Sequence, residues 1–245
     1  MVVTPVGWNG TGNSSDLGQN PLAQVSLARS WRTGSSEWCR VRFVAMVNGP
    51  GPRAMTRAQQ ARRQRVVDAA MSLGLGGGYE AVQMRDVAAR ADVAMGTVYR
   101  YFNSKDHLLA AALVYWVEQL DGRLSQRPAQ GTTAADRVIE ALDRALRAMG
   151  RQPQLVGAVF TALASPDPAA IECQQQVTIL MEGIITRAIG EPHPPNLSDR
   201  ARILGHVWYS ALAGWVNGWS SMVRVHDELV VAIGLLLPSD IYAEV

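Results

Sequence analysis

Residues 94–101 combine small residues with hydrogen-bond donors at helical spacing. Gly96, Thr97, Tyr99 and Arg100 fall within this stretch. The major groove of B-DNA is about 12 Å wide, so a helix that enters it needs a slim and polar exposed face. An arginine can also donate two hydrogen bonds to one guanine, which makes Arg100 the side chain expected to read sequence. These residue types therefore predict recognition of base pairs, with the Tyr99 hydroxyl available for a phosphate or a base.

Two further helices are expected to hold this segment in place. After Thr56, a good N-cap, apolar residues recur at helical spacing over 58–73. The glycine-rich run at 74–78 is expected to end that helix. A second short helix is expected over 84–91, followed by a tight turn at 92–93. Three helices in about fifty residues, the last two joined by a turn, predict a helix-turn-helix module.

The rest of the chain also has the pattern of helices. Ser104 is expected to cap a long fourth helix over 105–125. Gly or Pro residues end most of the later helical patterns, which cover residues 133–149, 154–164, 169–189, 198–225 and 227–237. No segment shows the period-two alternation of a half-buried strand. The sequence therefore predicts an all-α fold.

Charge divides the chain into a basic module and an acidic body. The net charge of the 245-residue chain is only +2. Residues 53–105 hold nine Lys or Arg and four Asp or Glu, whereas residues 106–245 hold ten basic and fifteen acidic residues. A basic module joined to an acidic body indicates a polyanionic partner for the module alone. We therefore expect a DNA-binding domain over 53–105 and a separate helical domain over 106–245.

Residues 1–52 differ from the rest in composition. They are rich in Gly, Ser, Asn and Pro and show no sustained periodicity. Such a segment cannot bury enough apolar surface to offset the entropy of ordering it, so we expect disorder. Its three tryptophans are unusual for a disordered tail. A second hypothesis is that translation starts at Met46 or Met55 and that the N-terminal extension is absent from the native protein, which N-terminal sequencing would decide.

Several other classes of protein are disfavoured. No run approaches the ~20 apolar residues of a membrane span, and the N-terminus lacks a secretory pattern, so we expect a cytoplasmic protein with no membrane partner. Cys39 and Cys173 are far apart and are expected to be reduced thiols. The four histidines fit no metal-binding motif, and the sequence has neither a glycine-rich phosphate loop nor a G-x-S-x-G motif. We therefore expect no metal, no cofactor and no enzymatic activity.

One stretch carries a family signature. Residues 82–109, VQMRDVAARADVAMGTVYRYFNSKDHLL, resemble the DNA-binding motif of the TetR family of repressors. The shared positions are Val87-Ala88, Ala91, Val93, Gly96, Tyr99, Tyr101-Phe102, Lys105 and Leu108. The resemblance implies nine or ten helices, a homodimer and a palindromic operator in double-stranded DNA. It also implies that a hydrophobic small molecule, bound in a C-terminal ligand-binding and dimerisation domain, lowers the affinity for DNA.

The same resemblance implies roles for individual residues. The residues expected to face bases are Gly96, Thr97, Tyr99 and Arg100. The residues expected to contact backbone phosphates are Met84, Arg85, Tyr101 and Lys105. Phe102 is expected in the core. For Lys105, a solvated surface charge is the alternative.

Two positions depart from the family pattern. The family often has glycine where Asp92 stands, and aspartate can adopt the left-handed conformation only at some cost. It often has serine capping the third helix where Ala94 stands, and losing that cap could cost about 1 kcal/mol. Neither departure removes the motif.

Within the family, the likeness is greatest to repressors of cholesterol catabolism in steroid-degrading bacteria. It rests on GGYEAVQMR at 77–85 and on the clusters at 206–210 and 213–215, and it covers residues 56–237. It implies a steroid or other lipid acyl-CoA as effector. The alternative is a regulator of an efflux or unrelated metabolic operon that senses a different hydrophobic ligand.

A pocket for an apolar effector is expected between the middle helices. The predicted wall residues are Leu120, Met149, Phe160, Leu163, Leu180, Ile184, Trp208 and Trp215. Each of these residues also suits an ordinary core. An acyl-CoA would need cations at the pocket mouth, for which Arg123, Arg127 and Arg151 are candidates, although surface charge is the simpler account of each.

The helix expected over 198–225 is apolar on two faces, so it must bury one in its own domain and the other against a partner. Gly214 and Gly218 are four residues apart and would leave a flat notch for a second helix. The predicted dimer interface comprises Leu204, Ala211, Gly214, Gly218, Trp219, Leu229 and Ile233. A core helix in a monomer is the alternative.

The expected mechanism is geometric. In a dimer, two modules must lie about 34 Å apart, or a multiple of that, to reach successive turns of one DNA face. Ligand is expected to shift the helix over 105–125 and so to change this spacing. A DNA-binding architectural protein without a ligand and an enzyme are the competing classes, which a ligand-sensitive band shift and turnover assays would separate.

Overall fold

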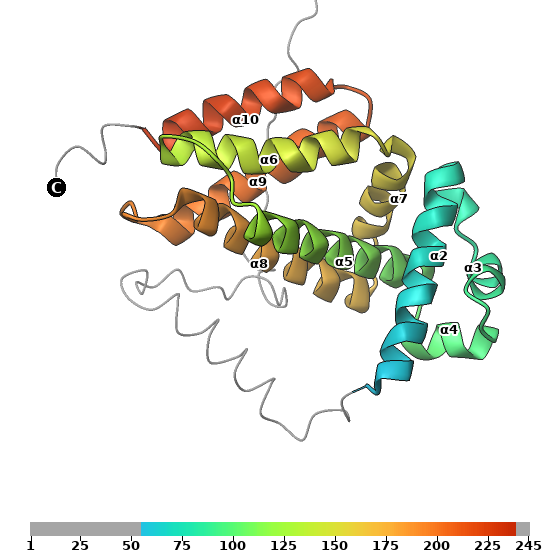
Figure 1. Cartoon of the computed structure of the whole chain (residues 1–245). Helices are drawn as coiled ribbons and strands as arrows, with labels where there is room; N and C mark the ends of the chain where they lie inside the picture. Colours follow the sequence, from blue (N-terminus) through green and yellow to red (C-terminus); the bar gives the residue numbers. More distant parts are fainter. Residues whose placement is uncertain (1–54, 239–245) are drawn as a thin grey trace, which may run out of the picture. The chain divides into compact units, whose positions relative to one another are not determined.

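The computed structural model describes residues 55–238, and within this range the regular secondary structure is all helical (Figure 1). The predictions made for residues 1–52 lie outside the described residues. The all-α prediction is confirmed for the described part, in which no helix is long and apolar enough to cross a bilayer. Its nine helices are α2 (Arg57–Ala81), α3 (Met84–Arg90), α4 (Met95–Tyr101), α5 (Lys105–Gln126), α6 (Ala134–Gly150), α7 (Pro153–Leu163), α8 (Pro168–Ile189), α9 (Leu197–Val216) and α10 (Met222–Leu236).

Helices α2, α3 and α4 form the predicted helix-turn-helix module. Thr56 starts α2 in a capping box: its hydroxyl accepts from the Gln59 N–H, and the Gln59 side chain accepts from the Thr56 N–H. Val98 and Phe102 are fully buried in a core shared with α2 and α3. The turn before α4 places Asp92 at φ +53°, in the left-handed conformation. This core fixes α4 so that its opposite face meets solvent.

Helix α2 is longer than predicted. It continues to Ala81, with a break at Gly77 and Gly78 where the backbone leaves the helical region. Gly78 has φ +66° and ψ −155°, a combination that is essentially restricted to glycine. The glycine run therefore interrupts the helix instead of ending it, and the residues after the break bring Tyr79 to the start of α5.

The N-terminus of α4 has no side-chain cap. Ala94 occupies the N-cap position with extended backbone angles and makes no capping hydrogen bond. A serine there would accept a hydrogen bond from the first turn, so Ala94→Ser is expected to raise the free energy of unfolding by about 1 kcal/mol. Urea unfolding followed by circular dichroism measures this change. Ala89→Ser, at an exposed position inside α3, is the control and should not stabilise; equal effects of the two would contradict the capping argument.

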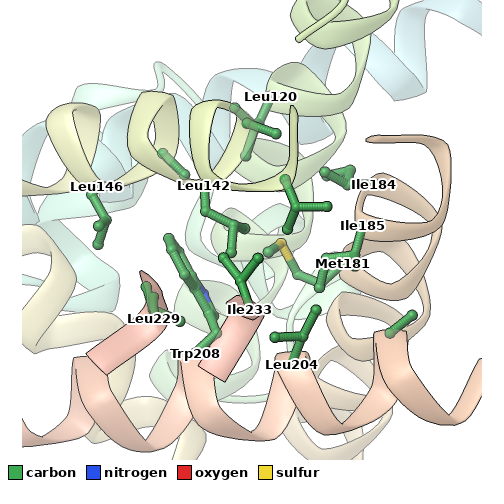
Figure 2. Packing of buried hydrophobic residues seen from close by; sticks show 14 of the residues in the cluster. Leu120, Leu142, Leu146, Met181, Ile184, Ile185, Leu204, Trp208, Leu229 and Ile233 are labelled. Carbon is green, nitrogen blue, oxygen red and sulfur yellow. The ribbon is translucent and has the colours of Figure 1, made fainter. Parts of the chain in front are cut away.

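Helices α5 to α10 enclose a second core. Figure 2 shows Leu142 of α6, Trp208 of α9 and Ile233 of α10 directed toward one another among these helices. Helix α6 begins with a capping box made by Thr133 and Asp136, and it buries one apolar face in this core. The body therefore has a packed centre of its own.

Helices α5 and α7 contribute to both cores. Leu108 and Leu109, near the start of α5, lie in the core of the helix-turn-helix module together with Ala162 of α7. Leu120, later in α5, lies in the core of the body. Packing is therefore continuous across residue 105, where the sequence suggested a domain boundary. A displacement of α5 or α7 would be transmitted directly to the module.

The prediction of one helix over 198–225 is wrong. Helix α9 ends at Val216, and Gly218 takes φ +79° in the turn that follows. The N–H groups of Trp219 and Ser220 both donate to the Gly214 carbonyl at 3.1 Å. Helix α10 then packs back on α9, so residues that looked like one continuous face lie on two helices.

Candidate nucleic-acid interface and effector cavity

The outer face of α4 carries the four residues that the sequence assigns to base contacts. Gly96 and Arg100 are exposed, Tyr99 is 50% exposed, and Thr97 is half-buried. The Arg100 guanidinium carbon lies 5.1 Å from the centroid of the Tyr101 ring, and Nη2 donates to the Tyr101 hydroxyl at 3.3 Å. Stacking on an aromatic ring restricts a long, flexible side chain. Arg100 is therefore held against Tyr101 at the exposed surface of α4.

Helix α3 begins beside α4 with Met84 and Arg85. Met84 is half-buried against the core of the module. The Arg85 side chain is 84% exposed and lies 3.3 Å from the Asp86 carboxylate. Exposed ion pairs contribute little to stability, so Arg85 can exchange Asp86 for a phosphate at small cost.

Lys105 lies against Tyr79 and is half-buried. Its Nζ atom is 3.6 Å from the Tyr79 ring centroid and donates to the Tyr79 carbonyl at 3.2 Å. The Tyr79 hydroxyl donates to Asp106 at 2.5 Å, and burial with this carboxylate raises the pKa of Tyr79 to about 12. An ammonium has three N–H donors, and the Tyr79 carbonyl accepts only one of them. Lys105 therefore has donors left for a phosphate, and this contact stays a prediction.

A hydrogen-bonded junction joins the end of the module to the start of α8. Ser104 caps α5 by accepting from the His107 N–H at 3.0 Å, and its hydroxyl donates to Asp167. Asp167 caps α8 by accepting from the Ala169 N–H, and these hydrogen bonds, first that from Ser104, hold the pKa of Asp167 below its usual range. Burial lowers the pKa of His107, whose Nδ1 accepts from the Asn103 N–H at 3.2 Å. The sequence predicts Ser104 as a cap but gives no sign of its partner 63 residues away.

A cavity of about 170 Å³ lies between α5, α7, α8 and α9. Four predicted wall residues line it, namely Met149, Phe160, Leu163 and Trp208. Trp116 of α5 forms another wall, and the Phe160 ring stacks on Tyr209 with centroids 5.3 Å apart. A smaller hollow of about 30 Å³ shares Trp116, Met149 and Phe160 with this cavity and reaches Met71 on α2. The cavity is thus linked by shared side chains to the DNA-binding module.

The other four predicted wall residues lie elsewhere. Leu120 is buried in the core of the body, and Leu180 and Trp215 pack against that core half-buried. Ile184 is also buried there, and it lines a separate hollow of about 250 Å³. For these four residues the alternative of an ordinary core describes their position better.

The polar residues that line the cavity were not predicted from the sequence. Gln174 and Thr178 come from α8, and Arg202, His206 and Tyr209 come from α9. The signal was available, because three of these residues are spaced i, i+4, i+7 and so share one helix face. The apolar residues between these three positions dominate the pattern of α9 and obscure this polar face.

The three cations proposed for the pocket mouth are not among the lining residues of this cavity. Arg123 and Arg127 are exposed at the end of α5, and Arg151 is exposed after α6. The alternative of plain surface charge therefore describes them better. Arg202 is the arginine that lines the cavity.

Four residues of the predicted dimer interface are buried inside the chain itself. Leu204, Ala211, Leu229 and Ile233 are at most 5% exposed, and Figure 2 shows three of them in the core of the body. They cannot contact a second chain, so this part of the prediction is wrong. The physical reason is that α10 folds back and buries the face of α9 that was assigned to a partner.

The chain's own Trp219 fills the predicted glycine notch. A Cβ atom on Gly214 would lie 2.7 Å from the Trp219 indole, so Gly214 is required for this close approach. Gly218 lies in the turn after α9 and not on its surface. Trp219 itself remains 69% exposed.

Helix α10 carries an exposed apolar stripe whose residues were not part of the predicted dimer interface. Val223, Val231 and Leu235 are 71%, 62% and 77% exposed, and the space beyond Gly234 is open. On the neighbouring helix α9, Ile203 is 40% exposed. Large apolar side chains gathered on one surface commonly mark a contact with another molecule.

These features define a class of protein. A polar helix in a helix-turn-helix module is coupled through α5 and α7 to a helical body with an apolar cavity, which is the architecture of a ligand-responsive DNA-binding regulator. Between residues 55 and 238, no group of three or more His, Cys, Asp or Glu side chains is placed to hold a metal ion.

Comparison with known proteins gives the family. Residues 66–112 match the bacterial regulatory proteins of the tetR family, and residues 131–236 match the tetracyclin repressor-like C-terminal domain. The chain is 42% identical over 183 residues to the HTH-type transcriptional repressor KstR of Rhodococcus jostii (strain RHA1), covering 74% of this chain and 84% of that protein. It is 39% identical over 181 residues to KstR of Mycobacterium tuberculosis (strain H37Rv), covering 74% and 82%. The chain belongs to the TetR family of transcriptional regulators.

Solved structures agree with this membership. A TetR transcriptional regulator from Rhodococcus sp. RHA1 superposes with a TM-score of 0.67 at 30% identity, covering 75% of this chain and 99% of that one. The regulator FadR from Bacillus subtilis, in complex with stearoyl-CoA, has a TM-score of 0.52 at 19% identity, covering 71% and 97%. The second likeness concerns the fold alone.

Proposed function

We propose that this chain is a homodimeric repressor of genes for steroid or lipid catabolism, released from a palindromic operator by a steroid- or lipid-derived acyl-CoA. The observation that carries the proposal is the 42% and 39% identity to KstR repressors over 74% of the chain, which includes both the module and the body. The steroid pathway follows from the same resemblance. The cavity and the polar face of α4 are the parts of the chain that would perform the two functions.

At the operator, α4 is proposed to enter the major groove. Gly96 lets the backbone approach base edges, and Arg100 donates two hydrogen bonds to a guanine. The residues proposed to contact phosphates are Met84, Arg85, Tyr101 and Lys105. Exposure of Arg85 and Arg100 and the excess of basic residues in the module support this arrangement.

The dimer is proposed to form through the exposed stripe of α10 and the adjacent part of α9. A twofold axis would bring Val223, Val231 and Leu235 of one chain against the same residues of the other. The absence of a side chain at Gly234 would let the two α10 helices approach closely. Trp219, most of whose surface is exposed, is proposed to contribute to the same interface.

The effector is proposed to occupy the cavity and to act by widening it. Its free space of about 170 Å³ is smaller than the roughly 300–1,000 Å³ of most ligand pockets. A steroid- or lipid-sized ligand would therefore have to move the surrounding helices, among them α5 and α7, which also hold the module. A ligand that binds only the widened state shifts the protein toward that state and away from the operator. FadR from Bacillus subtilis, which has a similar fold, was solved in complex with stearoyl-CoA, and this supports an acyl-CoA as the proposed effector.

The test is to capture genomic DNA fragments on the purified full chain and to sequence them. The expected fragments share a palindrome and lie beside genes for steroid or lipid breakdown. In band shifts on such a fragment, a steroid acyl-CoA is expected to weaken binding by roughly 5- to 150-fold. Retention no better than that of random duplex would refute the proposal. Fragments from an efflux or unrelated operon, with release by another hydrophobic compound, would support the alternative regulator.

A further inference from the structure

The polar side chains of the cavity of about 170 Å³ between α5, α7, α8 and α9 come from two of its helices. Helices α5, α6 and α7 contribute only apolar side chains, such as Trp116 and Phe160. All of its polar side chains come from α8 and α9, which contribute Gln174, Thr178, Arg202, His206 and Tyr209 together with apolar side chains such as Trp208. A molecule that fills this cavity therefore meets apolar side chains on every helix around it and hydrogen-bonding side chains only on α8 and α9.

Gly205 leaves the polar side open. It lines the cavity one turn after Arg202 and just before His206, in the interior of α9. A Cβ atom at this position would have no heavy atom within 4 Å, so no neighbouring element requires glycine there. Glycine is also among the least favourable residues in a helix interior. Its presence is explained if the missing side chain keeps a passage between α8 and α9.

Arg202 provides a cation with spare donors at this seam. Arg202 forms one ion pair with Asp199 at 2.7 Å, but a guanidinium has five N–H donors and can serve a second acceptor. Glu182 of α8 lies near Arg202 and His206, and burial raises the pKa of its carboxyl.

We infer that the cavity takes an amphipathic ligand whose apolar body lies against Trp116 and Trp208, while an anionic or carbonyl head group lies at the α8–α9 seam on Arg202 and His206, beside Gly205. This inference rests on the proposed effector role of the cavity. The shared chemistry is an acyl group that ends in a negatively charged head. A free carboxylic acid and a coenzyme A thioester both provide it, whereas a neutral alcohol does not.

The test is a binding titration of the full chain, followed by the fluorescence of the tryptophans that line the cavity. The probes are a steroid carboxylic acid, its coenzyme A thioester and the alcohol with the same skeleton. Arg202→Gln is expected to weaken binding of the charged probes by about 10- to 100-fold and to leave the alcohol unchanged. Arg147→Gln is the control, because Arg147 is similarly exposed and also pairs with a carboxylate, but on α6.

A second variant tests the passage. Gly205→Leu should weaken every probe at least about 10-fold, because its side chain would occupy the seam. Gly122→Leu, on an exposed part of α5 with open space around it, should bind the probes as the wild type does. Circular dichroism and operator binding confirm that each variant is folded.

The outcomes separate this inference from the proposed function. Binding of the thioester alone, or of the acid as well, supports the inference and identifies the source of the charge. Equal binding of all three probes, unaffected by Arg202→Gln, overturns it while the cavity remains an effector site. Failure of every probe to bind the wild-type chain or to release operator DNA overturns the inference and the proposed acyl-CoA effector together.

Discussion

Replacing Leu235 with arginine is expected to convert the protein from a dimer to a monomer and to abolish tight operator binding. Leu235 is the most exposed large apolar residue of the α10 stripe, at 77%. In a twofold dimer the substitution would bury two unpaired guanidinium groups, which costs several kcal/mol per interface. Sedimentation should show the mass falling from twice 26.5 kDa to 26.5 kDa. Operator affinity should fall by at least about 100-fold, because two half-sites are no longer held together.

The control for this experiment is Ile179→Arg. Ile179 is an apolar residue that is 62% exposed on α8, away from the stripe. The same charge introduced there should leave both the mass and the operator affinity unchanged. A dimeric Leu235→Arg protein, or a monomeric Ile179→Arg protein, would show that the chains associate through a different surface.

Replacing Arg100 with alanine is expected to weaken specific binding by about 1–3 kcal/mol, or roughly 5- to 150-fold, and to relax the preference at one base pair. Arg100 is the exposed arginine of α4 that is proposed to pair with a guanine, and its removal leaves the fully buried core residues Val98 and Phe102 in place. Affinities for the operator, for single-base variants of it and for random duplex would be measured at one fixed salt concentration. An unchanged order of preference among the operator variants would assign sequence reading to another residue.

Arg85→Ala is the matched comparison for the loss of a positive charge. Arg85 is exposed on α3 and is proposed to contact a phosphate, so its loss should weaken specific and random DNA alike. It should also reduce the slope of log affinity against log salt by about one. The two arginines therefore separate base recognition from phosphate contact within one module.

The local features of the DNA-binding module could be predicted from sequence. Thr56 and Ser104 cap the helices to which they were assigned, and Phe102 is buried as predicted. Asp92 takes the left-handed conformation that its place in the motif implied. The two caps depend on residues within a few positions of each other, so helical spacing and capping chemistry are sufficient to find them. The burial of Phe102 and the conformation of Asp92 were expected from the resemblance to the TetR motif. Whether the exposed residues bind bases and phosphates is a question for the DNA experiments.

The body was harder to predict because its key contacts join distant parts of the chain. Apolar periodicity marks Leu204 and Ile233 as buried but does not say whether a partner or the chain itself buries them. One turn at Gly218 decided this, because it returned α10 onto α9 and exposed Val231 and Leu235 instead. The same limit applies to the cavity, where Trp208 and Leu120 have the same apolar pattern but only Trp208 lines the cavity between α5, α7, α8 and α9.

The amino-acid sequence by itself determined the all-helical fold, the helix-turn-helix motif and the family, because these are written in short-range spacing and residue type. Only the tertiary structure decided which apolar faces remain exposed, which side chains surround the cavity, and that Ser104 meets Asp167 across 63 residues. The physical reason is that burial depends on the path of the whole chain, whereas a helix and its caps depend on neighbouring residues alone.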